Sequence, residues 1–101
     1  KKTDGQIDWS KTAVEIYNQV RAFSPWPASY TKFGNLSVKI LKIKVVKKNL
    51  KPGEISIDEN KFIVGTSLDA IEVLELQPAN KKNMTAAEFI RGYHKYLPQS
   101  K

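Results

Sequence analysis

A thirteen-residue stretch, residues 36–48 (LSVKILKIKVVKK), alternates apolar and Lys side chains and constrains the fold more than any other feature of the chain. Because successive side chains of a β-strand point to opposite faces, this pattern predicts one long strand with an apolar face and a basic face. The alternation slips by one residue between Ile40 and Leu41, so we expect a β-bulge there that bends the strand. Such a bulge would keep five apolar residues inside: Val38, Ile40, Leu41, Ile43 and Val45. A long strand that bends in its middle is typical of a small closed barrel.

The basic face of the same stretch carries Lys39, Lys42 and Lys44, and Lys47 and Lys48 follow. The net charge is +7, and it is unevenly placed: residues 1–51 have a net charge of +8, whereas residues 52–101 have −1. A one-sided positive field favours a polyanionic partner, nucleic acid ahead of a membrane, because no expected helix has a Lys-rich polar face. The alternative is a solvated lysine surface that has no partner.

Length and composition narrow the class of protein. The chain has 101 residues, enough for one domain. It has no Cys, which excludes disulfides and thiolate metal sites, and no apolar run near the roughly 20 residues of a membrane span. The first residues are polar and do not form a signal peptide, so we expect a cytoplasmic protein.

Periodicity predicts a helix, five short strands and a second helix. Ser10 is the expected N-cap of a helix over residues 11–22 with a buried stripe at Ala13, Ile16, Tyr17 and Val20. The expected strands cover residues 30–33, 36–48, 54–57, 61–65 and 70–76. In the last strand Ile71 and Val73 share one face and Leu74 and Leu76 the next, so the one-residue slip recurs.

A capping box of Thr85 and Glu88 opens the second helix. The expected fold is therefore mainly β with flanking helices: a small five-stranded barrel of the oligonucleotide-binding type, with a helix first and a helix last. A flat sheet covered by the two helices is the alternative.

The chain offers little for catalysis. Its one His, His94, flanks the apolar stripe of the second helix with no nucleophile nearby, so we expect a surface or packing role. Glu72 and Glu75 are expected on a solvated face of their strand. The His, Cys and carboxylate residues show no metal-ligand spacing, and the glycines form no phosphate loop. We expect no catalytic residue and no metal ligand in these 101 residues.

Binding of phosphate is the better-supported chemistry. Lys supplies a point charge without the planar fork of Arg, so it suits backbone phosphate more than base edges. We expect Tyr30 and Phe33 to pack in the core, which argues against a platform for stacked bases. The expected phosphate-binding residues are Lys1, Lys2, Lys39, Lys42, Lys44, Lys47, Lys48, Lys81 and Lys82.

Several motifs occur together in one order along nearly the whole chain. They are residues 7–10 (IDWS), 20–27 (VRAFSPWP), the lysines within 39–44, 52–55 (PGEI), and 76–79 (LQPA) followed by Lys81, Lys82 and Met84. In this order they resemble the C-terminal domain of the methionyl-tRNA formyltransferase family. Ala28 and Asn80 stand where the family usually has Gly, and residues 67–70 replace a more Gly-rich turn. Asn tolerates the left-handed backbone, so the change at position 80 is mild.

The resemblance implies an enzyme of translation initiation that transfers a formyl group from 10-formyltetrahydrofolate to the methionine amino group of initiator methionyl-tRNA. It implies that this chemistry and its folate donor belong to an N-terminal Rossmann-like domain, so no cofactor is expected in this chain. The C-terminal domain would be an oligonucleotide-binding-type barrel that holds tRNA through positive charge along the linker and the barrel face. Residues 1–9 would then be the linker entering the domain, with Lys1 and Lys2 as the linker lysines. Residues 10–101 would be the single tRNA-binding barrel domain.

The expected partners are initiator methionyl-tRNA and the N-terminal catalytic domain of the same enzyme, with no membrane and a monomeric chain. Two other interpretations stay open. One is the related domain of a sister formyltransferase that acts on a nucleotide sugar or releases formate from the folate. The other is a free-standing barrel that binds single-stranded nucleic acid.

Overall fold

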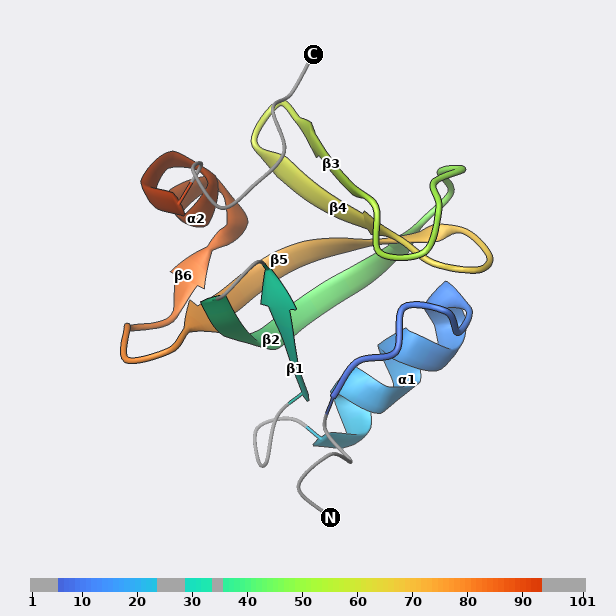
Figure 1. The fold of residues 1–101 in the computed structure, drawn as a ribbon, viewed down its shortest axis with the longest axis horizontal. Coiled ribbons are helices and arrows are strands. Elements are labelled where there is room, and N and C mark those ends of the chain that lie inside the picture. The colour runs from blue at the N-terminus through green and yellow to red at the C-terminus, as the bar shows by residue number, and fades with distance from the viewer. Residues whose placement is uncertain (1–5, 24–28, 34–35, 94–101) are drawn as a thin grey trace.

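The structure, a computed structural model, describes residues 6–23, 29–33 and 36–93, and within them two helices flank six strands (Figure 1). The helices are α1 (Ala13–Phe23) and α2 (Ala86–Tyr93). The strands are β1 (Ser29–Phe33), β2 (Leu36–Val46), β3 (Ile55–Asp58), β4 (Lys61–Gly65), β5 (Ala70–Pro78) and β6 (Met84–Thr85). The predicted mainly β fold with a helix first and a helix last is confirmed, and the structure adds the short strand β6.

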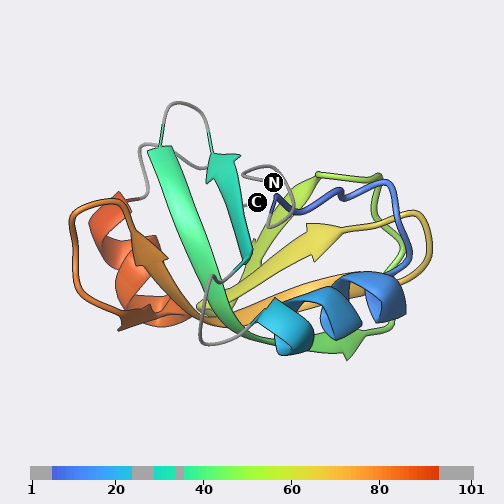
Figure 2. The same ribbon diagram turned by 90° about the horizontal axis from the view of Figure 1, so that it is seen from below.

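The strands form one antiparallel sheet in the order β1-β2-β5-β4-β3, and β6 pairs with β5 outside that row. In a flat sheet β1 and β4 would lie three strand spacings apart, about 14 Å. The ring of Phe33 on β1 nevertheless contacts that of Phe62 on β4, with centroids 5.1 Å apart. This contact fits the curled sheet seen in Figure 2 and favours the rolled architecture over the flat alternative.

The predicted slip in the long strand is confirmed, but its consequence differs from the prediction. The β2–β5 register runs Ile40 opposite Leu76, then Lys42 opposite Glu75, then Ile43 opposite Val73. Each strand therefore carries one extra residue, Leu41 on β2 and Leu74 on β5. Val38, Ile40 and Ile43 are buried and Val45 packs against the core, whereas Leu41 is only half-buried outside the core cluster. The prediction that all five apolar residues lie inside is wrong for Leu41, because a bulged residue leaves the alternation of its strand.

Helix α1 begins later than predicted because Thr12, not Ser10, caps it. The Glu15 backbone N–H donates to Thr12 Oγ1 (3.2 Å), and the Thr12 N–H donates to Glu15 Oε1 (3.0 Å). This reciprocal pair is a capping box. The Glu15 carboxylate accepts hydrogen bonds from the Thr12 backbone N–H and, second, from the Thr12 hydroxyl (3.2 Å), and these two bonds lower the pKa of Glu15. Ser10 instead donates its hydroxyl and its N–H to Asp8 Oδ1, and these bonds lower the pKa of Asp8.

The apolar stripe of α1 covers the core at one end of the sheet, with Ala13, Ile16 and Val20 buried. Figure 2 shows α1 at that end and α2 beside β6 at the other. The predicted capping box of α2 is confirmed, since the Thr85 N–H donates to Glu88 Oε1 (2.9 Å). Phe89 is fully buried against Phe62, with ring centroids 5.6 Å apart.

The segment before α1 is attached to the sheet. Ile7 is buried, and its N–H donates to the Tyr30 carbonyl (2.9 Å). The indole Nε1–H of Trp9 donates to Thr31 Oγ1 (3.1 Å). The chain therefore enters the domain alongside β1. The described residues do not include Lys1, Lys2 or His94, so the roles predicted for these three residues stay predictions. Ala28, where the family usually has Gly, also lies outside them.

Candidate nucleic-acid interface

The outer face of β2 places each of its three lysines opposite one residue of β5. Lys39 lies opposite Gln77, Lys42 opposite Glu75 and Lys44 opposite Glu72. The lysines are exposed, as predicted, but the face is not uniformly basic. Its charge depends on the β5 residue that the bulged register brings beside each lysine.

Two of the three lysines are paired with carboxylates. Lys42 Nζ lies 3.7 Å from Glu75 Oε2, and Lys44 Nζ lies 3.7 Å from Glu72 Oε1. Glu72 is only 8% exposed, so the prediction of a solvated face is wrong for this residue. A carboxylate beside an ammonium weakens the local positive potential, so the middle of the β2 face is close to neutral.

Lys39 belongs to a second group of charges at one end of β2. The turn after β5 folds back on the start of β2, where the Ala79 N–H donates to the Ser37 carbonyl (2.9 Å). The side-chain amide of Gln77 donates to the Lys81 carbonyl (2.8 Å), which fixes the turn that carries Lys81 and Lys82. We call Lys39, Lys81 and Lys82 the turn cluster. In the described part of the chain none of the three has a carboxylate within ion-pair distance.

A small hollow of about 120 Å³ lies beside the turn cluster and is lined by Ser37, Lys39, Gln77, Pro78, Ala79 and Asn80. Asn80 has a φ of 64°, which is the left-handed backbone conformation. Gly adopts this conformation readily and Asn tolerates it, which explains why Asn can stand where the family usually has Gly. Sequence reasoning did not assign Gln77 or Asn80 to the site, because only the strand register and this turn place them beside Lys39.

Lys47 and Lys48 form a separate group, the loop cluster, where the chain leaves the other end of β2. The loop is held by its own hydrogen bonds: the Lys51 N–H donates to Glu54 Oε1 (2.9 Å), and the Glu54 N–H donates to the Lys51 carbonyl (2.9 Å). The chain turns at residues 52–53, where Gly53 has a φ of 82°. Gly65 packs so closely that a Cβ there would lie 2.6 Å from Leu50 Cβ. The loop cluster is therefore fixed to the sheet.

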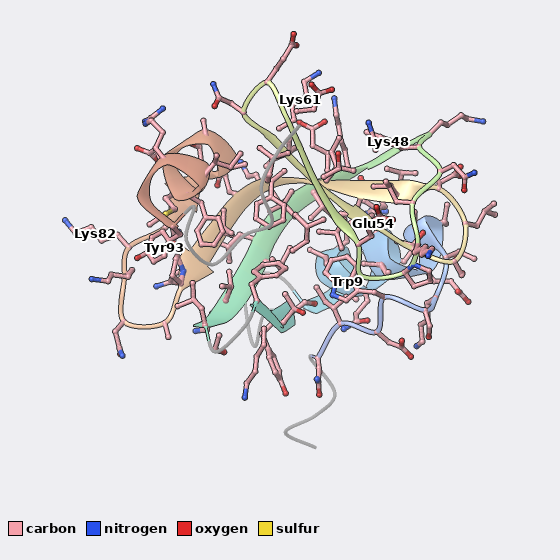
Figure 3. All side chains as sticks on the ribbon, turned by 45° about the horizontal axis from the view of Figure 1, so that its top comes forward. Trp9, Lys48, Glu54, Lys61, Lys82 and Tyr93 are labelled. Atoms are coloured by element: carbon pink, nitrogen blue, oxygen red, sulfur yellow. The ribbon has the colours of Figure 1, made fainter. Side chains whose placement is uncertain are left out.

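The loop cluster also borders a hollow, of about 420 Å³, lined by residues 47–50 and 66–69. Its far wall is a rigid turn, because Thr66 Oγ1 donates to the carbonyls of Leu68 (2.6 Å) and Asp69 (2.9 Å). Asn49 and Ser67 contribute polar side chains to this hollow, and sequence reasoning assigned neither. Figure 3 shows Lys48 and Lys82 on opposite sides of the molecule.

The aromatic residues near the lysines divide between the two faces of β1. Phe33 is buried, so the packing prediction is confirmed for it. Tyr30 lies opposite Lys39 in the β1–β2 register and is half-buried on the outer face. The prediction that Tyr30 packs in the core is therefore wrong, and Tyr30 is an aromatic neighbour of Lys39 in the turn cluster.

The extra leucines of the two bulges open an apolar groove between α1 and the sheet. The groove holds about 380 Å³ and is lined by Tyr17, Val20, Arg21, Leu41, Lys42, Ile43 and Leu74. Arg21 lies over the Tyr17 ring, 5.5 Å from its centroid. The lining has no carboxylate or imidazole that could move a proton, so it does not fit a folate-dependent transfer and we derive no catalytic step from it.

Two kinds of feature are absent from the part of the chain that the structure describes: a cluster of potential metal ligands and a membrane-spanning helix. Residues 6–23, 29–33 and 36–93 bring no three His, Cys, Asp or Glu side chains into position to hold an ion. Neither described helix has the length and apolar character needed to cross a bilayer.

Comparison with known proteins places the chain in a family. The family model described as "Formyl transferase, C-terminal domain" matches residues 1–94. The methionyl-tRNA formyltransferase of Thermodesulfovibrio yellowstonii is 45% identical over 92 residues, covering 91% of this chain and 30% of that protein. The methionyl-tRNA formyltransferase of Koribacter versatilis is 43% identical over 94 residues, covering 92% of this chain and 30% of that protein. The chain thus spans less than a third of the length of these relatives.

The fold also has a solved counterpart. The crystal structure of HypX from Aquifex aeolicus in complex with tetrahydrofolic acid superposes with a TM-score of 0.72 at 16% identity, covering 91% of this chain and 17% of that one. At this identity the likeness extends to the fold alone. The match of the family model over nearly the whole chain, together with the two close relatives, shows that the chain belongs to the family of formyl transferase C-terminal domains.

Proposed function

We propose that this chain is the tRNA-holding domain of a methionyl-tRNA formyltransferase, and that it binds the phosphate backbone without performing chemistry. The whole enzyme would formylate the methionine amino group of initiator methionyl-tRNA in the cytoplasm. Its 10-formyltetrahydrofolate donor and its catalytic residues would belong to an N-terminal domain of the same protein, and the enzyme would act as a monomer.

The observation that carries this proposal is a set of five lysines that lack carboxylate partners among the described residues: the exposed Lys39, Lys47, Lys81 and Lys82 and the half-buried Lys48. Lys ammonium groups bind phosphate oxygens as point charges and read little sequence. The relatives' name, methionyl-tRNA formyltransferase, supports tRNA as the polyanion. Lys1 and Lys2 are proposed to add contacts where the chain enters the domain, and Lys42 and Lys44 to contribute less because carboxylates lie beside them.

Binding of tRNA at two salt concentrations tests the proposal. Counting one phosphate contact for each of these five lysines alone, affinity should fall at least about 500-fold between about 50 mM and about 200 mM salt. Replacing Lys39, Lys81 and Lys82 with Ala leaves two contacts, and the same salt step should then cost only about 12-fold. Absence of binding at the lower salt concentration would refute the proposal and leave the lysines as a solvated surface.

A sister formyltransferase acting on a nucleotide sugar is separated by the same assay. The domain of such an enzyme would not need to bind tRNA more tightly than it binds a smaller anion such as a nucleotide sugar. Binding of initiator tRNA no tighter than that of a nucleoside diphosphate sugar would favour the sister enzyme.

A further inference from the structure

The two lysine clusters are fixed at opposite ends of one strand. Residues 39 and 47 are eight positions apart on and just after β2, which at about 3.3 Å per residue is about 26 Å, and the bulge shortens this to about 23 Å. The turn cluster is tied to the sheet by the Ala79–Ser37 and Gln77–Lys81 hydrogen bonds. The loop cluster is tied to it by the Lys51–Glu54 bonds and the close packing of Gly65. The separation is therefore a property of the fold.

The stretch between the clusters is unsuited to phosphate. Lys42 and Lys44 are paired there with Glu75 and Glu72, and the Glu75 side chain is 40% exposed. A single strand that followed β2 would pass its phosphates over this carboxylate. Proteins that hold single strands instead line a continuous basic groove and add aromatic stacking. The charge pattern here is basic, neutral, basic.

We propose that the domain holds a double-helical RNA segment by two separated stretches of its phosphate backbone, one at the turn cluster and one at the loop cluster. In a duplex the phosphates lie along the edges of a groove, so a groove can face the neutral middle of β2 while the edges reach the lysines. Duplex RNA is recognised in this way, by shape and by phosphates on either side of a groove. Each cluster borders a hollow, of about 120 Å³ and about 420 Å³, where Asn80 and Asn49 can add hydrogen bonds to phosphate oxygens. The larger hollow is also lined by Asp69, whose carboxylate repels phosphate, so the contacts are expected on the side formed by Lys47, Lys48 and Asn49. This inference rests on the proposed function and adds the shape of RNA that the domain selects.

Titration of the 15N-labelled 101-residue chain tests it directly. The probes are an RNA duplex of about 16 base pairs, the length that double-stranded-RNA-binding domains span, one strand of that duplex alone, and inorganic tripolyphosphate. We expect one duplex per chain, with amide resonances of residues 47–49 and 80–82 shifting together at a single midpoint. Tripolyphosphate is too short to bridge the clusters, so it should shift the two sets of resonances with independent midpoints. The single strand should bind at least tenfold more weakly than the duplex.

Variants separate the two clusters. Replacing Lys47 and Lys48 with Ala should reduce the duplex's affinity loss between about 50 mM and about 200 mM salt from about 500-fold to about 40-fold. Replacing Lys39, Lys81 and Lys82 should reduce it to about 12-fold. The matched control replaces Lys61 and Arg91, two exposed cations outside both clusters, and should leave the shift pattern unchanged.

The outcomes distinguish this inference from the proposed function. Shifts at only one cluster, or a single strand that binds as tightly as the duplex, would overturn the two-cluster inference while leaving phosphate binding intact. Failure of tRNA and duplex alike to bind at the lower salt concentration would overturn both.

Discussion

Replacing Glu75 with Gln should make the domain bind RNA more tightly. Glu75 Oε2 lies 3.7 Å from Lys42 Nζ, and the side chains are 40% and 68% exposed. Gln keeps the shape of Glu but removes its charge, so the variant frees one ammonium and removes one carboxylate that repels phosphate. An exposed pair of this kind contributes at most about 1 kcal/mol to the free energy of unfolding, so the variant should fold.

The size of the effect follows from the number of phosphate contacts. With Lys42 available, the contacts rise from five to six, and the slope of log affinity against log salt steepens by about 0.9. The loss of affinity between about 50 mM and about 200 mM salt should then grow from about 500-fold to about 1,800-fold. The gain should be most evident at the lower salt concentration, where screening is weakest.

Fluorescence anisotropy of a labelled RNA duplex, measured across the salt series, would give both affinities and slopes. The control variant is Glu59→Gln, which makes the same change in net charge in the β3–β4 turn, where Glu59 has a φ of 51°. If both variants steepen the slope equally, net charge alone governs binding and the local argument is refuted. An unchanged slope for Glu75→Gln would show that Lys42 does not reach phosphate.

Three further changes test the fold and its charge. Leu76→Ala should lower the free energy of unfolding by about 2–5 kcal/mol, because the Leu76 side chain is 0% exposed. Leu74→Ala should lower it by less than about 1 kcal/mol, because Leu74 is 36% exposed. Urea denaturation measures both values, and equal losses would contradict the β2–β5 register. Gly65→Ala should cost about 1–3 kcal/mol and shift the amide resonances of the adjacent loop, and an unchanged spectrum would contradict that packing. The pKa of Glu15 is lowered from its ordinary value of 4.5, so the ionised carboxylate stabilises the fold at pH values above 4.5. This stabilisation is lost as the pH falls through the pKa of Glu15 in the folded state. Thermal melts should therefore show a smaller difference between the native chain and Glu15→Gln at pH 3 than at pH 7, and a constant difference would contradict the assignment.

The sequence predicted the fold well where a local pattern determines the structure. The alternation of residues 36–48 specified the β2 face that carries the lysines, and the one-residue slips in two strands predicted both bulges. Thr85 and Glu88 predicted the start of α2, because a capping box depends on two residues three apart. The cap of α1 was missed because Ser10 and Thr12 are both good caps, and only Thr12 has a Glu three positions later.

The charge of the site could not be predicted in the same way. Whether a lysine is paired depends on the residue opposite it on another strand, and a one-residue shift in register changes every such pair. Glu72 and Glu75 were visible in the sequence, but their positions beside Lys44 and Lys42 follow from two bulges acting together. Leu41 was assigned to the core for the same reason, since the sequence does not say which residue of a slip is left unpaired.

The paired lysines bear on what such a domain can select. Phosphate contacts position a nucleic acid but carry no sequence information. A continuous basic strand would hold any polyanion, whereas two clusters about 23 Å apart with a neutral interval favour a partner whose own phosphates are held at a fixed separation. Glu72 and Glu75 would then act by exclusion, since their pairing with Lys44 and Lys42 withholds a sixth and a seventh phosphate contact that would strengthen the binding of a flexible strand. The proposed two-cluster surface therefore selects the shape of RNA, and the choice among tRNAs of that common shape has to be made by groups outside this lysine surface.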